Sequence, residues 1–266
     1  MTTPKRPSRK LGVHTSWDPV ARWYDGWVGA GGSYHHRTLA IPAVLDLLAP
    51  QPGEHILDLG AGQGVLAPFI ARAGAHYIGV DASPYLINIA RRRHDRDGIF
   101  LVGDARRLPN VAGLRPNTFD SVVLLLSIQD MDPLDPVCAS IAWALAEGGR
   151  TVLLMTHPCF RIPRQSGWGW DDERKLQYRR IDRYFSPLPV PMKEYGGEHT
   201  GSTRSFHRPL QAYINGLADH HLLVDSMREI LGSIPPEVRR RDRAVSTAHQ
   251  EIPLFLALRA TKITRT

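Results

Sequence analysis

The stretch that decides the fold is His55–Gly64, which reads HILDLGAGQG. Its first five residues predict a short strand, its three glycines predict a tight turn, and the apolar spacing that follows predicts a helix ending near Gly74. Such a turn lets the backbone lie close to a nucleoside-bearing ligand and leaves free N–H groups at the helix N-terminus. A dinucleotide fingerprint would need glycine in place of Val65, so the spacing differs from that of a dinucleotide site.

Strand and helix signals alternate downstream of this turn. A capping residue before proline predicts helix starts at Ser83-Pro84 and Asp135-Pro136. Apolar runs predict six more strands, over residues 77–80, 99–102, 119–126, 151–155, 222–230 and 253–260. Short helices are expected upstream, over residues 17–27 and 34–48. The alternation predicts an α/β fold with a doubly wound, mostly parallel sheet.

Five ordered motifs resemble those of the class I S-adenosylmethionine-dependent methyltransferases. The first is Asp58 followed by glycines in G-x-G-x-G spacing, and the others lie at the ends of the following strands or before them. They are Gly79–Ser83, Gly103–Ala105, Phe119–Val123 and Leu145–Arg150, the last with Glu147 where the family usually has proline. The resemblance covers roughly residues 17–157 and extends to a small-molecule group similar to the ubiquinone-biosynthesis methyltransferases.

This resemblance implies a fold and a cofactor. The fold would be a Rossmann-like methyltransferase sheet of seven strands, with an N-terminal helical cap, an insert after the fifth strand and an antiparallel last strand. The cofactor would be S-adenosyl-L-methionine, bound outside the carboxyl ends of the strands. The resemblance assigns Asp58, Gly60 and Gly62 to its methionine part, Asp81 and Ala82 to the ribose, Asp104 and Ala105 to the adenine, Leu126 to the sulfonium, and Tyr24 to the cap over it. Taken singly, a glycine-rich turn or a strand-end aspartate is more often turn or cap chemistry than a binding site.

The order of segments predicts five parts of the chain. Residues 1–16 read as a flexible basic tail, 17–50 as the helical cap, 51–157 as the cofactor-binding core, 158–206 as a substrate-side insert or lid, and 207–266 as a helix and hairpin that complete the sheet. The 49-residue insert interrupts the alternation and carries eight aromatic residues, which argues for a functional segment rather than disorder.

Two histidines are candidate general bases. His157 follows the fifth strand on the cofactor side, and His207 lies in an H-R-P-L segment that resembles one found after the insert in the same group. Phe160, Trp168 and Trp170 are candidate substrate contacts, although such aromatics equally fit a small satellite core under a long loop. No spacing in the chain indicates a metal site.

Charge and composition limit the classes of partner. The 33 Lys and Arg against 26 Asp and Glu give a net charge of +7, but Lys5, Arg6, Arg9 and Lys10 contribute four of these charges from the expected tail. The longest apolar run is far shorter than the roughly 20 residues that span a bilayer, and two cysteines make a disulfide framework improbable. We therefore expect a cytoplasmic protein without a membrane partner, and the charge favours an anionic or aromatic small molecule over nucleic acid.

The function predicted from these observations is methyl transfer from S-adenosyl-L-methionine to a small-molecule acceptor by direct SN2 attack. Two alternatives remain at this point: an RNA methyltransferase, suggested by the charge, and a non-catalytic cofactor-binding or interaction protein. The sequence leaves open which acceptor atom is methylated, which residue acts as base, whether the insert orders only on ligand binding, and the oligomeric state.

Overall fold

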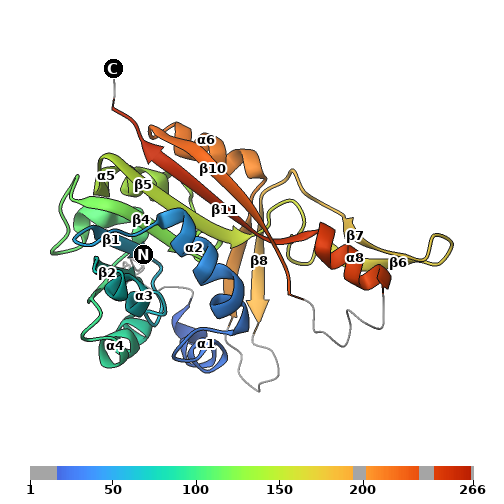
Figure 1. The fold of residues 1–266 in the computed structure, drawn as a ribbon, viewed down its shortest axis with the longest axis horizontal. Coiled ribbons are helices and arrows are strands. Elements are labelled where there is room, and N and C mark those ends of the chain that lie inside the picture. The colour runs from blue at the N-terminus through green and yellow to red at the C-terminus, as the bar shows by residue number, and fades with distance from the viewer. Residues whose placement is uncertain (1–16, 194–201, 234–242, 265–266) are drawn as a thin grey trace, which may run out of the picture.

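The computed structural model describes residues 17–193, 202–233 and 243–264 (Figure 1). The expected tail at residues 1–16 and the basic cluster Arg239–Arg241 lie outside these ranges. Among the described residues, no helix is long and apolar enough to cross a membrane.

A seven-stranded sheet in the order β10-β11-β5-β4-β1-β2-β3 forms the centre of the molecule. The first five strands along the chain pair in parallel, and β11 runs antiparallel to both of its neighbours. This confirms the predicted mostly parallel sheet and its antiparallel last strand. The strands are β1 (His55–Leu59), β2 (His76–Asp81), β3 (Ile99–Val102), β4 (Phe119–Leu125), β5 (Leu145–Thr156), β10 (Leu222–Leu231) and β11 (Pro253–Lys262).

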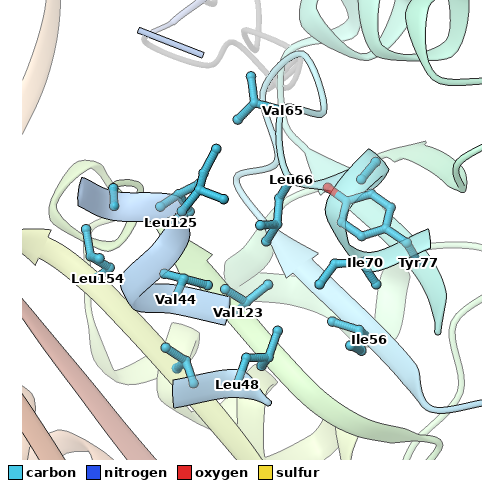
Figure 2. Packing of buried hydrophobic residues seen from close by; sticks show 14 of the residues in the cluster. Val44, Leu48, Ile56, Val65, Leu66, Ile70, Tyr77, Val123, Leu125 and Leu154 are labelled. Atoms are coloured by element: carbon cyan, nitrogen blue, oxygen red, sulfur yellow. The ribbon is translucent and has the colours of Figure 1, made fainter. Parts of the chain in front are cut away.

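Helices cover both faces of the sheet, as the doubly wound prediction requires. Successive residues of β4 show this directly, because Val123 and Leu125 belong to one buried cluster and Val122 and Leu124 to the other. The first cluster packs against α2 (Ile41–Leu48), α3 (Ala67–Arg72) and α4 (Pro84–Arg93), and Figure 2 shows part of it. The second packs against η3 (Ala105–Asn110), α5 (Asp135–Ala144) and α6 (Leu210–Ala218).

The N-terminal region is helical, as expected. It contains η1 (Asp18–Val20), α1 (Ala21–Val28) and a helix in which the π-type turn η2 (His36–Ala40) leads into α2. Val28 at the end of α1 is buried in the first cluster, so this region is anchored to the sheet.

The segment after β5 forms two hairpins rather than one lid. β8 (Leu188–Lys193) pairs with β9 (Ser202–His207), and β9 packs against η1 and η4 (Ile128–Asp130), close to the sheet. β6 (Ser166–Asp171) pairs with β7 (Leu176–Ile181) and forms an arm beside α8 (Arg243–Glu251), as Figure 1 shows. α8 has no counterpart among the helices expected from the sequence, since a nine-residue helix with one apolar stripe gives a weak signal.

Candidate active site

A cavity of about 530 Å³ opens at the carboxyl ends of the parallel strands. Seven of the nine residues expected to bind the cofactor line it: Tyr24, Gly60, Asp81, Ala82, Asp104, Ala105 and Leu126. These residues come from α1, from the ends of β1, β2 and β4, and from the start of η3. A cavity of this size is within the usual range for a small-molecule or cofactor site.

The turn after β1 requires glycine at position 60. Gly60 has a φ of +74°, and a Cβ added to it would lie 2.5 Å from the Cβ of Ser127. The Ser127 hydroxyl donates to the Leu59 carbonyl at 2.7 Å, which fixes the end of β4 against this turn. The backbone at Gly60 therefore borders the cavity without any side chain between it and a ligand.

Asp81 is held at the cavity edge by two backbone groups. Its Oδ2 accepts from the N–H of Gly62 at 2.9 Å, and its Oδ1 accepts from the N–H of Ser83 at 2.8 Å. Burial raises the pKa of this carboxyl, and the two hydrogen bonds oppose that shift. The carboxylate retains lone pairs for a further donor, such as a ribose hydroxyl.

Asp58 is buried and does not itself line the cavity. The Tyr77 hydroxyl donates to its Oδ2 at 2.7 Å, while its Oδ1 is buried with no hydrogen-bond partner among the described residues. Burial raises the pKa of Asp58 to about 7, against the lowering effect of the Tyr77 hydrogen bond. A cation or a hydrogen-bond donor next to Oδ1 would satisfy this carboxylate.

Asp104 is engaged by a neighbouring arginine. Arg106 donates to its two carboxylate oxygens at 2.8 to 3.2 Å and also to the Asp132 carbonyl at 2.6 Å. The pKa of Asp104 is lowered, because the hydrogen bonds and charge of Arg106 outweigh the effect of burial. Arg106 therefore joins the segment after β3 to the segment after β4 at the rim of the cavity.

The N-terminal helical region contributes two rings to the cavity. Trp17 and Tyr24 pack edge to face with their centroids 5.0 Å apart, and both line the cavity. Burial raises the pKa of Tyr24 well above its usual value, and the charges of Asp130, Asp81 and Asp58 add to the shift. A phenol kept neutral at this position can exclude water from the site.

His157 is not among the residues that line the cavity, although it follows β5 as expected. Its Nε2 lies 2.9 Å from Oε1 of Glu229, and its Nδ1 accepts from the Cys159 N–H at 3.2 Å. Both ring nitrogens thus have partners within the protein, Glu229 on β10 and the backbone after β5, and β5 lies two strands away from β1. This geometry does not support the expected role of His157 as a general base.

His207 faces away from the cavity because of its position in β9. Arg204 and Phe206 line the cavity, while Thr203, Ser205 and His207 are buried on the opposite side of the strand. The ring Nε2 of His207 donates to the Tyr184 carbonyl at 2.6 Å, and the histidine borders a separate cavity of about 10 Å³. His207 is therefore not positioned as a base for a ligand in the large cavity.

The three aromatic residues expected to contact substrate also lie outside the cavity. Trp168 packs between the guanidinium groups of Arg161 and Arg179, at 5.0 and 5.2 Å from its ring, and 4.7 Å from the His249 ring. Phe160 packs against His157, and Trp170 is exposed on the β6–β7 arm. The packing of Trp168 and Phe160 fits the alternative given above, a satellite core, whereas the exposed Trp170 is not part of one.

Several cavity-lining residues were not singled out from the sequence. Asp130 ends η4, and Arg204 and Phe206 come from β9 of the insert, with Trp17 and Met131 beside them. One signal for Asp130 was available, since a polar residue soon after a buried strand lies at the ligand edge of a parallel sheet. Arg204 and Phe206 are two residues apart and share a face of a strand, which only the strand assignment reveals.

Residues 57–153 match the model of a methyltransferase-domain family, described as "Methyltransferase domain". This stretch is a methyltransferase domain. It contains the end of β1, the glycine turn, Asp81, Asp104 and Asp130, and so most of the cavity wall.

Curated relatives are similar to this chain over stretches of 111 to 160 residues. A "Ubiquinone biosynthesis O-methyltransferase" from Xylella fastidiosa is 27% identical over 136 residues, which are 50% of this chain and 55% of the relative. A "Demethylmenaquinone methyltransferase" from Beutenbergia cavernae is 32% identical over 111 residues, 42% of this chain and 44% of the relative. The chain spans about half the length of the curated relatives it matches.

Solved structures share the fold over most of the chain. An S-adenosylmethionine-dependent methyltransferase from Mesorhizobium loti covers 88% of this chain and all of its own, with 23% identity and a TM-score of 0.67. A protein from Listeria monocytogenes described as such a methyltransferase covers 85% of this chain and 97% of its own, with 22% identity and a TM-score of 0.66. These similarities extend the fold assignment beyond the methyltransferase domain.

The residues of the cavity fit S-adenosylmethionine. Behind the cavity wall, the Oδ1 of Asp58 has no hydrogen-bond partner among the described residues and can satisfy an ammonium group through water, and the bare backbone of Gly60 leaves room beside it. Asp81 and Asp104 supply carboxylate acceptors from two further strand ends, as a nucleoside requires.

Proposed function

We propose that this protein transfers a methyl group from S-adenosyl-L-methionine to a small-molecule acceptor by direct in-line attack. The observation that carries the proposal is that one cavity gathers Gly60, Asp81 and Asp104 from three separate strand ends. Each residue type suits one part of the cofactor, and their order along the chain follows that of the family motifs.

In this proposal the chain holds the cofactor through groups already in place. Asp58 neutralises the ammonium, Asp81 accepts from the ribose hydroxyls, and Asp104 with the Ala105 amide binds the adenine edge. The bound cofactor supplies an electrophilic methyl group on a positively charged sulfur. Leu126, Tyr24 and Trp17 exclude water around that group, so orientation and desolvation provide most of the rate increase.

The division of the chain into functional parts follows from the same cavity. We infer that residues 17–50 act as the cap and 51–157 as the cofactor-binding core. Of the insert at residues 158–206, the β8–β9 hairpin contributes to the cavity, while the β6–β7 arm contributes no lining residue. Residues 207–266 complete the sheet.

The proposal can be tested by following methyl transfer from cofactor labelled in its methyl group into a small-molecule metabolite extract. We expect labelled product with the wild type and at least about tenfold less with Asp81→Asn, at a cofactor concentration below the wild-type Kd. Asp95→Asn is the matched control, because Asp95 is an exposed aspartate away from the cavity. Absence of labelled product from the wild type across extracts would contradict the proposal.

A further inference from the structure

The cavity has an end that the cofactor residues do not account for. Trp17, Met131 and Phe206 line it with apolar or aromatic surface, and its charged side chains include Asp130, Arg204 and Asp132, the last bound by Arg208. β9 carries Arg204 and Phe206, and it packs against η1 and η4. The residues at this end of the cavity therefore come together from these three segments.

Asp130 is the buried carboxyl at this end. Its Oδ1 is inaccessible to solvent and makes no hydrogen bond within the described part of the chain. Leaving such an atom unsatisfied is unfavourable in a folded protein, so a donor from a ligand that reaches it would be favoured. Asp132, two residues on, differs because its carboxylate binds Arg208 at 2.7 Å.

The groups around Asp130 set its affinity for a proton. Burial raises the pKa of Asp130 to about 8, while the Ser205 hydroxyl and the charge of Arg208 act in the opposite direction. The phenols of Tyr24 and Tyr213 also face it, and both are kept neutral by burial. The carboxylate form is thus a stronger base than an ordinary aspartate.

Arg204 places a positive charge on the same cavity. Its side chain is exposed, and the described residues offer it no ion pair. Arg208 by contrast is buried, and its Nη2 donates to Asp132 and to the Met131 carbonyl, while its Nη1 has no hydrogen-bond partner among the described residues.

We propose that Asp130 is the general base for the acceptor, that Arg204 binds an anionic group on it, and that the acceptor is an aromatic hydroxy acid. This inference rests on the proposed function and adds the substrate class and two residues to it. Trp17 and Phe206 favour a flat ring, Asp130 faces its hydroxyl, and Arg204 selects the acid.

The step at Asp130 is a proton transfer concerted with methyl transfer. The hydroxyl oxygen forms a bond to the methyl carbon, and the carbon–sulfur bond breaks with its electron pair passing to sulfur, which becomes a neutral thioether. The hydroxyl proton passes to the Asp130 carboxylate, which later releases it to solvent. The products are the methyl ether and S-adenosylhomocysteine, and no oxidant or reductant is needed.

The test uses three acids of increasing length or hydroxylation: 4-hydroxybenzoate, 3,4-dihydroxybenzoate and 4-hydroxycinnamate. Their binding to the protein saturated with S-adenosylhomocysteine is measured by calorimetry, and methyl transfer from labelled cofactor is measured between pH 6 and 9. Asp130→Asn and Arg204→Gln are compared with the exposed controls Asp95→Asn and Arg115→Gln.

We expect Arg204→Gln to weaken the binding of each acid at least tenfold. The affinity for the corresponding phenol without the carboxylate should change less than threefold. Asp130→Asn should bind the acid with an affinity within threefold of wild type, but its kcat should fall about 10²- to 10⁴-fold. The rise in kcat/KM toward pH 8 that the wild type shows should be absent from this variant. Intact S-adenosylhomocysteine affinity in both variants shows that they fold.

Two results would overturn the inference. One is that the wild type binds S-adenosylhomocysteine but methylates none of the three acids, which leaves the proposed function standing. The other is that Asp130→Asn retains the wild-type rate. Failure of the wild type to bind S-adenosylhomocysteine would instead contradict the proposed function itself.

Discussion

The Tyr77 hydroxyl donates to Oδ2 of Asp58 at 2.7 Å, which fixes a buried carboxyl whose second oxygen has no partner within the described residues. Tyr77 lies at the second position of β2 and Asp58 near the end of β1, and these parallel strands are paired directly. The hydrogen bond orients one oxygen of the carboxylate and leaves the other for a ligand. Burial of an incompletely satisfied carboxylate destabilises the cofactor-free protein and favours cofactor binding.

Asp58→Asn should change how stability depends on pH. The folded protein keeps the Asp58 proton up to about pH 7, whereas the unfolded chain loses it near pH 4. The folded state therefore binds more protons between these values, and the free energy of unfolding falls as pH rises through this window, by up to about 4 kcal/mol. Asn cannot titrate, so the variant should lack this part of the slope.

Chemical unfolding at pH 4.5 to 8 measures the difference between wild type and Asp58→Asn. Asp130 contributes a similar slope to both proteins and cancels in the comparison. Asp95→Asn, an exposed aspartate, serves as the control and should follow the wild type. Equal slopes for wild type and Asp58→Asn would contradict the assigned burial of this carboxyl.

Gly60→Ala should be more destabilising than Gly113→Ala. Both glycines have positive φ, at +74° and +93°, so both substitutions carry the same kind of backbone strain. Only at Gly60 does the new Cβ meet a neighbour, the Cβ of Ser127 at 2.5 Å. We expect an additional loss of about 1–3 kcal/mol in the free energy of unfolding, and comparable losses in the two variants would argue against close packing at the turn.

His157→Gln should affect folding and not cofactor binding. The ring has partners at both nitrogens and lies away from the cavity, so its replacement should lower the free energy of unfolding by about 1–3 kcal/mol. S-adenosylhomocysteine affinity, measured by calorimetry, should stay within twofold of wild type. A variant with wild-type stability but no methyl transfer would restore His157 as a candidate base.

Trp168→Ala and Trp170→Ala test the role of the β6–β7 arm. Trp168 packs between two guanidinium groups and a histidine ring, whereas Trp170 is 44% exposed. We expect Trp168→Ala to lower thermal stability by about 1–3 kcal/mol and Trp170→Ala by less than about 0.5 kcal/mol, with cofactor affinity unchanged in both. Loss of cofactor affinity in either variant would show that the arm reaches the site.

The cofactor half of the site could be predicted from sequence because its chemistry is local. The turn at Gly60, the carboxylate of Asp81 and the segment that begins with Asp104 each follow a strand directly, so the sheet topology alone brings them together. Six of the nine expected contacts line one cavity for this reason, and a seventh, Tyr24, reaches it from α1.

The acceptor half could not be predicted in the same way. His207 and Phe206 are neighbours in the chain but point to opposite sides of β9, a distinction that depends on strand register. His157 is engaged by Glu229 from β10, a partner 72 residues away. Asp130 and Arg204 line the same cavity because β9 packs against η4, and no local sequence pattern predicts that packing.

The most direct test of the account is a calorimetric titration of S-adenosylhomocysteine into the wild type, Asp81→Asn and Asp95→Asn. Asp81 would make charge-assisted hydrogen bonds to the ribose, each worth about 1.5–3 kcal/mol, so its loss should weaken binding roughly 10- to 100-fold. We expect one S-adenosylhomocysteine site per chain in the wild type and the same affinity in Asp95→Asn. The affinity of Asp81→Asn should be roughly 10- to 100-fold weaker. No binding by the wild type, or equal affinity in all three proteins, would contradict it.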